Sequence, residues 1–437
     1  MKMKQKGVRW LWMGLLLMVC SFLLAGCGDD DTAVKITMPP QVASEDAGAD
    51  TPTAVDVYWD ATYSMAGYAT LPEGNFYRTL PDELGDLGSS MGGVTFYRFG
   101  EEIKELPGRE YRQFSNPGYY TEVITAFHNV IDKADASHLS IVVTDLFESD
   151  ADWSNVTQKL KEKYFGQHLS IAIIGIKNPF KGDIFDVGID AAKYAYDSGT
   201  APERYRPFYL FIMGPDKKVT DFVSRFRERQ QGVQNETQYL VFSEQLAAQS
   251  LDFSRLELSA SQNIFRDDKL HVQDQRIREF GIDSSDDATS LETTFPYQPA
   301  LGALPVDLSK LNVKAEVLTL EGDEWQPVEK RDSDLTAKIV PGEAENTYSI
   351  QVSLTPSKSL EDGKVNFVHV MAAPDAQSYR MPDWVTKWNM ANADVNAAAF
   401  DGSKTINFLH IVESLKSSIL AAAHPSLVNL DFVIDER

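Results

Sequence analysis

The sequence has only two cysteines in 437 residues, Cys20 and Cys27. Both belong to the N-terminal region, where four basic residues precede an apolar run from Leu11 to Leu24, the pattern of an export signal. Removal of residues 1–26 would take away Cys20 and leave one cysteine, so no disulfide could form. Hydrophobic cores must therefore stabilise the 411 residues that remain (437 minus 26), and that length predicts two or three domains.

Catalytic and cofactor-binding motifs are also missing. The seven histidines have no zinc-ligand spacing, and the sequence contains no GxSxG motif, P-loop or dinucleotide-binding fingerprint. No general base or nucleophile is placed by a motif either. We therefore expect a binding protein and not an enzyme.

Basic residues are few relative to acidic ones. The formal net charge is −23, and without the four basic residues of the export signal it becomes −27, from 37 basic and 64 acidic residues. Nucleic-acid binding requires a basic surface that displaces counterions, and this sequence has none. The acidity fits solubility, repulsion from anionic lipid headgroups, or affinity for cations.

The N-terminal region ends in Leu24-Ala25-Gly26-Cys27, which resembles a bacterial lipobox. The resemblance implies a signal peptide at residues 1–26, a lipid on the Cys27 sulfur, and a location in the cell membrane or envelope facing outside the cytoplasm. An apolar run of about 14 residues is shorter than the ~20 that a membrane-spanning helix needs. Residues 27–52 are acidic and poor in large apolar residues, which predicts a flexible tether. Gly28 leaves the choice of inner or outer membrane open.

Residues 53–246 alternate between short apolar strands and amphipathic helices. This pattern predicts an α/β domain with a doubly wound, mostly parallel, Rossmann-like sheet. The predicted strands are Val55–Trp59, Val94–Phe99, Leu139–Thr144, Leu169–Ile176, Pro207–Met213 and Gln238–Phe242, and the predicted helices are Phe76–Leu87, Glu122–Ala134, Trp153–Tyr164 and Val219–Arg229. The stretch from Phe180 to Arg206 interrupts the alternation and is predicted to be a surface excursion.

The hydrophobic period changes to two in residues 251–380. Tyr348, Ile350, Val352 and Leu354 alternate with polar residues, as expected for a β-rich, sandwich-like domain of immunoglobulin-like size. Residues 381–437 contain a helical stripe from Ile406 to Leu420 and a last strand at 427–434. Whether this helix and strand complete the sandwich or fold back on the first domain stays open.

Oxygen-bearing side chains follow two of the predicted strands and precede one helix. Asp60, Thr62 and Ser64 follow the first strand, Thr121 precedes the helix at 122–134, and Asp145 follows the strand at 139–144. The carboxyl ends of parallel strands face a common crevice, so these side chains can converge. Taken singly, Thr121 could cap its helix and the two aspartates could be turn residues.

In order and type, these residues resemble the metal-ion-dependent adhesion site of the von Willebrand factor A family, across residues 54–245. The resemblance implies that Thr62, Ser64 and Thr121 bind Mg²⁺, or another divalent cation such as Ca²⁺ or Mn²⁺, with Asp60 and Asp145 as charged partners. It also implies that an acidic side chain of a partner protein completes the coordination. Tyr63 and Leu146 depart from the family pattern, in which a small residue and a glycine are common, and this affects loop geometry and metal affinity.

These features predict a lipid-anchored envelope protein that binds a protein partner through a divalent cation. A metal-independent structural or assembly subunit of an envelope complex is the alternative, and a metal-dependent enzyme is a third. The identity of the partner, the oligomeric state and the role of the β-rich region stay open.

Overall fold

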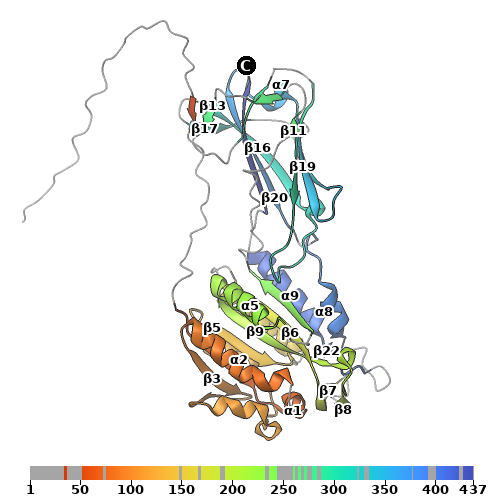
Figure 1. The fold of residues 1–437 in the computed structure, drawn as a ribbon. Coiled ribbons are helices and arrows are strands. Elements are labelled where there is room, and N and C mark those ends of the chain that lie inside the picture. The colour runs from red at the N-terminus through yellow and green to blue at the C-terminus, as the bar shows by residue number, and fades with distance from the viewer. Residues whose placement is uncertain are drawn as a thin grey trace, which may run out of the picture.

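The computed structural model describes residues 34–36, 52–71, 75–146, 150–165, 169–187, 192–231, 236–243, 259–260, 264–266, 270–272, 278–282, 287–321, 324–328, 334–375, 377–391, 400–422 and 427–436. The expected signal peptide and Cys27 lie outside these residues. An α/β body and a β-rich body lie end to end (Figure 1). Among the described residues, no helix is both long and apolar enough to span a membrane.

A seven-stranded mixed sheet forms the centre of the α/β body. Its order is β10 (Thr237–Phe242), β6 (Leu169–Asn178), β9 (Arg206–Pro215), β5 (Leu139–Thr144), β2 (Val55–Asp60), β3 (Val94–Phe99) and β4 (Ile103–Leu106). All six predicted strands are present, and β4 is an addition at one edge.

The prediction that this sheet is mostly parallel was wrong. Only the pairings of β2 with β3 and with β5 are parallel, whereas β9 lies antiparallel between β5 and β6, and β10 and β4 are antiparallel edge strands. Parallel neighbours need a crossover connection, usually a helix. Between β6 and β9 the chain instead forms a hairpin of β7 (Lys181–Val187) and β8 (Ala192–Asp197), so β9 returns in the opposite direction.

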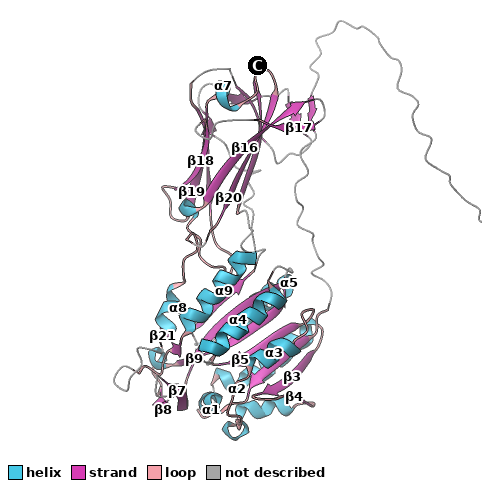
Figure 2. Cartoon of the chain, turned by 180° about the vertical axis from the view of Figure 1, so that it is seen from behind, coloured by secondary structure: helices cyan, strands magenta, loops and turns pink. Residues whose placement is uncertain are grey.

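Helices cover both faces of the sheet. Figure 1 shows α2 (Phe76–Met91) and α5 (Asp216–Arg229) on one face, which also carries α1 (Tyr63–Ala69). Figure 2 shows α3 (Phe127–Lys133), α4 (Asp150–Tyr164) and α9 (Phe408–Ala422) on the other, with α8 (Asp383–Trp388) beside α9. Short 3-10 turns lie at Glu110–Ser115, Pro117–Tyr119, Pro202–Arg204 and Leu308–Lys310.

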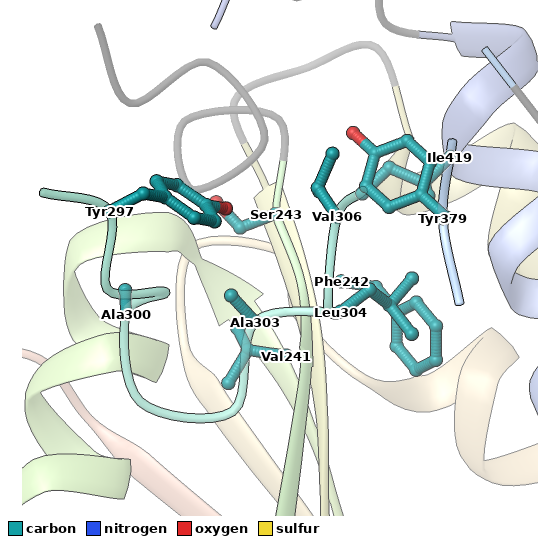
Figure 3. Close-up of a pocket in the computed structure, with 10 residues that line it drawn as sticks. All are labelled: Val241, Phe242, Ser243, Tyr297, Ala300, Ala303, Leu304, Val306, Tyr379 and Ile419. Atoms are coloured by element: carbon teal, nitrogen blue, oxygen red, sulfur yellow. The ribbon is translucent and has the colours of Figure 1, made fainter. Parts of the chain in front are cut away.

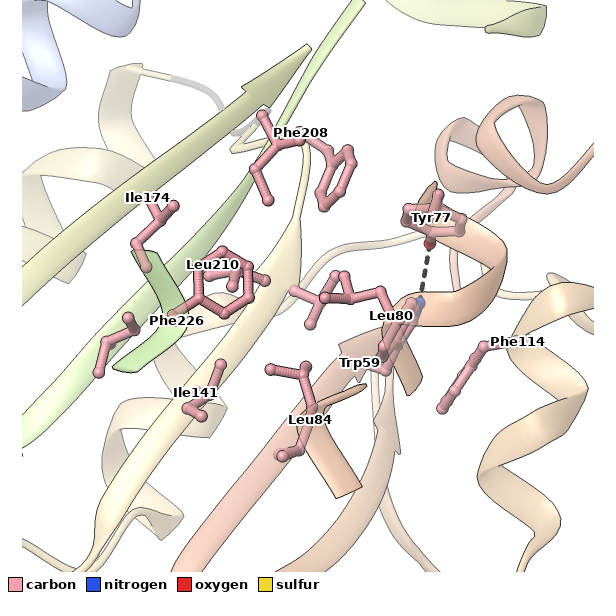
Figure 4. Packing of buried hydrophobic residues seen from close by; sticks show 14 of the residues in the cluster. Trp59, Tyr77, Leu80, Leu84, Phe114, Ile141, Ile174, Phe208, Leu210 and Phe226 are labelled. Atoms are coloured by element: carbon pink, nitrogen blue, oxygen red, sulfur yellow. Dashed lines mark hydrogen bonds between the residues drawn. The ribbon is translucent and has the colours of Figure 1, made fainter. Parts of the chain in front are cut away.

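Strand β2 is buried along its whole length, which fixes its end in position. The Trp59 ring stacks on Phe114 with 4.7 Å between centroids, and its Nε1–H donates to the Tyr77 hydroxyl at 2.8 Å (Figure 4). The Tyr77 hydroxyl in turn lies 2.9 Å from that of Tyr120. This buried network holds β2, α2 and the segment before α3 together, because buried polar groups must pair.

The β-rich body is a sandwich of two sheets. One sheet has the order β11 (Ser259–Ala260), β15 (Thr289–Pro296), β19 (Thr347–Leu354) and β18 (Leu335–Pro341), and the other has β12 (Ile264–Arg266), β14 (Arg278–Ile282), β23 (Val428–Glu436), β20 (Val365–Ala373), β16 (Asn312–Glu321) and β17 (Glu324–Pro327). Short helix α7 spans Pro356–Ser359. Buried side chains from both sheets form one core, as expected of a sandwich.

The C-terminal helix and strand belong to different bodies. Helix α9 packs on the sheet of the α/β body, whereas β23 is a strand of the sandwich, paired with β20 and β14. Two further small pairings occur, between β21 (Asn389–Met390) and β22 (Thr405–Ile406), and between β1 (Val34–Ile36) and β13 (Leu270–Val272). The predicted tether at 27–52 therefore contains one short strand.

The two bodies meet beside β10. Val241 forms a parallel β-bridge with Ala303, and the Val241 N–H donates to the Gly302 carbonyl at 2.8 Å. Lys416 Nζ of α9 donates to the Tyr379 carbonyl at 3.0 Å. A small pocket at this junction is lined mostly by apolar side chains (Figure 3), namely Val241, Phe242, Ser243, Tyr297, Ala300, Ala303, Leu304, Val306, Tyr379 and Ile419.

Candidate metal-binding site

Asp60 is the centre of the candidate site at the carboxyl end of β2. Its side chain is fully buried, and Oδ1 accepts from the Thr62 N–H at 2.9 Å and the Thr62 hydroxyl at 2.7 Å. Oδ2 accepts from the hydroxyls of Thr144 at 3.0 Å and Thr125 at 3.3 Å. Asp60 thus fills the turn role considered above and also joins three segments that lie far apart in the sequence.

Thr62 and Ser64 lie together, as predicted. Their hydroxyl oxygens are 3.1 Å apart, and Ser64 is half-buried at the start of α1. Thr62 occupies the N-cap position of α1, yet its side chain makes no capping hydrogen bond and instead donates to Asp60. Both hydroxyls therefore lie at the carboxyl end of β2.

The segment before α3 differs from its prediction. Helix α3 begins at Phe127 with Ala126 as its N-cap, so Thr121 does not cap it. Glu122 forms a parallel bridge with Thr62, with Tyr63 N–H donating to the Glu122 carbonyl at 3.0 Å. The β-branched residues Val123, Ile124 and Thr125 disfavour helix and suit this extended path.

The threonine that contacts Asp60 in this segment is not the one that the sequence predicted. Thr121 is exposed, and its hydroxyl accepts from Arg98 Nη2 at 3.0 Å. Arg98 also pairs with Glu122 at 2.9 Å. Thr125, four residues later, contacts Asp60, so the described structure brings Thr125 and not Thr121 to the centre of the site.

Asp145 follows β5 and is 2% exposed, beside Asp60 as predicted. Its Oδ2 lies 3.5 Å from Nη2 of Arg206, which is also 2% exposed. Arg206 Nη1 donates to the carbonyls of Gly402 and Lys404 at 3.2 and 3.0 Å. Although burial opposes its charge, Tyr68 and Asp145 raise the pKa of Arg206 above the ordinary value, so the guanidinium is a fixed positive charge beside Asp145.

The two carboxylates have different electrostatic surroundings. Burial, with a smaller contribution from the neighbouring Asp145, raises the pKa of Asp60 from 3.8 to about 7, against the opposing effect of its hydrogen bonds. Burial favours the neutral form of a carboxyl group unless an opposite charge lies near it. A bound cation would supply that charge.

Leu146, directly after Asp145, has an unusual backbone. Its φ is 56°, in the left-handed region that glycine prefers, and its side chain is 2% exposed. The Leu146 N–H donates to the Thr144 hydroxyl at 3.2 Å, which holds the turn. Glycine would adopt this backbone with less strain than leucine.

The available donors suit a hard divalent cation. Thr62, Ser64 and Thr125 offer hydroxyl oxygens, and Asp60 offers charge. Two ligands at right angles around Mg²⁺ at ~2.1 Å would lie about 3.0 Å apart, close to the Thr62–Ser64 separation. No group of three or more His, Cys, Asp or Glu side chains in the described part of the chain is arranged to hold a metal.

Sequence reasoning missed Thr125, Thr144 and Arg206. Thr125 lies in the same TEVIT segment as Thr121, and Thr144 directly precedes Asp145. Their closeness in sequence to predicted site residues was a signal that could have identified both. A buried position for Arg206, at the start of the apolar strand β9, depends on β9 lying next to β5. Only the sheet order could reveal it.

Comparisons with known proteins do not assign this chain to a family. No family model matches the sequence, and no curated protein matches it. A solved structure described as that of Astrotactin-2, a vertebrate-specific and perforin-like membrane protein involved in neuronal development, is similar over 29% of this chain and 18% of that chain, with 16% sequence identity and a TM-score of 0.16.

Proposed function

We propose that this chain is a lipid-anchored cell-envelope protein whose α/β body, similar to a von Willebrand factor A domain, binds a protein partner through a divalent cation. The supporting observation is the Asp60 cluster. Thr62 and Thr125 each donate a hydroxyl hydrogen bond to this buried carboxylate, the Ser64 hydroxyl lies 3.1 Å from that of Thr62, and Asp145 lies close to Asp60.

In this proposal, Thr62, Ser64 and Thr125 hold the cation, directly or through water. Asp60 orients two of these hydroxyls by accepting their protons in hydrogen bonds, which leaves the oxygen lone pairs for the ion. The cation would supply a Lewis-acidic position that accepts a carboxylate of the partner. Cys27 would anchor the protein to the membrane.

Calorimetric titration of the full chain with Mg²⁺ tests the site. Ser64→Ala and Thr125→Val should lose the binding heat, because each removes one proposed ligand, the hydroxyl beside that of Thr62 and the hydroxyl that donates to Asp60 respectively. Thr121→Val is the matched control and should keep the heat, because the Thr121 hydroxyl contacts Arg98. Equal heats for the wild-type protein and Ser64→Ala would refute the cation site.

Arg206 favours a second candidate, a metal-independent structural or assembly subunit. Its guanidinium already balances one of the two carboxylates without a metal. Cross-linking in cells with and without EDTA separates the two functions. A scaffold keeps its neighbours after chelation, whereas a cation-dependent binder loses them.

A further inference from the structure

Large apolar side chains are strongly exposed at one place in the described part of the chain. Tyr63 is 49% exposed, Val123 is 81% exposed and Ile124 is 55% exposed. Tyr63 lies between Thr62 and Ser64, and Val123 and Ile124 directly precede Thr125. We call these three side chains the apolar rim, because they lie next to the hydroxyls of the candidate site.

Backbone hydrogen bonds hold the chain before Val123 and after Ile124. Before Val123, Tyr63 N–H donates to the Glu122 carbonyl and Glu122 N–H donates to the Ala61 carbonyl, both at 3.0 Å, and after Ile124, Ala126 N–H donates to the Gly100 carbonyl at 3.2 Å. Gly100 permits this approach, because a Cβ there would lie 2.5 Å from the Glu122 Cβ. The exposure of Val123 and Ile124 is therefore a property of an ordered segment.

Charge decides which occupant suits this surface. A second copy of the chain would bring together two molecules that each carry a net charge of −23, and an anionic lipid surface would repel the chain in the same way. A cation amid the three hydroxyls instead attracts a carboxylate. The apolar rim would exclude water from that contact and strengthen it, as residues around an interface hot spot do.

We propose that the apolar rim and the cation site form one docking surface for a partner-protein loop that carries a carboxylate flanked by apolar side chains. The carboxylate part rests on the proposed function. The apolar part rests on Tyr63, Val123 and Ile124 alone. The two parts are therefore separable by mutation.

Selection from a library of disulfide-closed loops displayed on phage, against the full chain in detergent with Mg²⁺, tests this proposal. Selected loops should contain Asp or Glu next to a large apolar residue. Val123→Thr/Ile124→Thr keeps both positions β-branched but makes them polar, and it should weaken the binding of synthetic copies of these loops by roughly tenfold or more. Val123→Ile/Ile124→Val keeps the surface apolar and should bind as the wild-type protein does.

The outcomes distinguish the two parts. If Ser64→Ala loses the preference for an acidic residue while the apolar preference persists, both parts are supported. If selected loops bind the Val123→Thr/Ile124→Thr variant as tightly as the wild-type protein, the docking surface is overturned but the cation site is not. Failure to select any loop would also overturn the docking surface.

Two other occupants have their own tests with the same variant. Dimerisation of the wild-type chain in sedimentation, lost in Val123→Thr/Ile124→Thr, would show a self-association surface and overturn the proposal. Flotation with vesicles of phosphatidylethanolamine and phosphatidylglycerol, again lost in this variant, would show a lipid contact and overturn it equally.

Discussion

The ends of strands β2 and β5 each carry a buried aspartate, and they differ in what balances its charge. Asp145 at the end of β5 faces the buried guanidinium of Arg206. Asp60 at the end of β2 accepts hydrogen bonds but forms no ion pair with any residue that the structure describes, and its pKa is raised to about 7. The same residue type at the same edge of one sheet thus has a buried counter-charge at β5, whereas at β2 it is stabilised by hydrogen bonds.

Removal of Arg206 should have the largest effect on this comparison. Arg206→Met leaves Asp145 buried without its counter-charge, and we expect the free energy of unfolding to fall by about 3–5 kcal/mol in urea titrations. Asp145→Asn in the same chain should recover part of this loss. Arg225→Met is the control, because it removes an exposed pair with Asp221 on α5 and should cost about 0.5 kcal/mol.

A similar small loss for both arginine variants would contradict the role given to Arg206. The β5 end would then have no permanent counter-charge. In that case the two strand ends would be electrostatically alike.

The pH dependence of the free energy of unfolding should reveal the raised pKa of Asp60. Because its pKa rises from 3.8 to about 7 on folding, the folded state keeps a proton that the unfolded state releases. The free energy of unfolding should therefore fall between about pH 4 and pH 7, by at most ~1.4 kcal/mol per pH unit. Mg²⁺ favours the charged carboxylate and should reduce this fall.

Urea unfolding at several pH values, with and without Mg²⁺, measures the effect. Asp60→Asn should flatten the dependence in this window. Asp197→Asn is the control, because hydrogen bonding to Lys181 lowers the pKa of that exposed carboxylate, and its loss should leave the fall in place. An unchanged slope in Asp60→Asn would assign the dependence to another group.

The same comparison explains what the sequence could predict. Asp60, Thr62, Ser64 and Asp145 could be predicted to lie near one another because they stand at or shortly after the ends of two strands with a clear apolar pattern. Thr121 was predicted because the helical pattern was extended too far toward the N-terminus, where a bridge between Glu122 and Thr62 holds the chain extended. Long-range pairing overrode local periodicity there.

Strand direction and long-range partners were beyond the sequence pattern. A buried strand reads the same in either direction, so the pattern located β9 but gave no sign that it runs antiparallel between β5 and β6. Arg206 reaches Asp145 only because of that insertion. Likewise, the amphipathic stripe predicted α9, but an apolar face does not say which of two bodies it covers.

The smallest expected effect is a difference in stability between two variants of Leu146, whose backbone positions Asp145. Leu146→Ala should cost about 2–5 kcal/mol, because it leaves a cavity and keeps a left-handed backbone. Leu146→Gly removes the same side chain but relieves a conformational cost of about 1–2 kcal/mol, so it should be the more stable variant by about that difference. At Leu160, buried on helix α4, the order should reverse, because glycine disfavours helix by about 1 kcal/mol relative to alanine. Urea unfolding of the four variants checks both orders, and alanine more stable than glycine at residue 146 would mean that the turn after β5 is not strained.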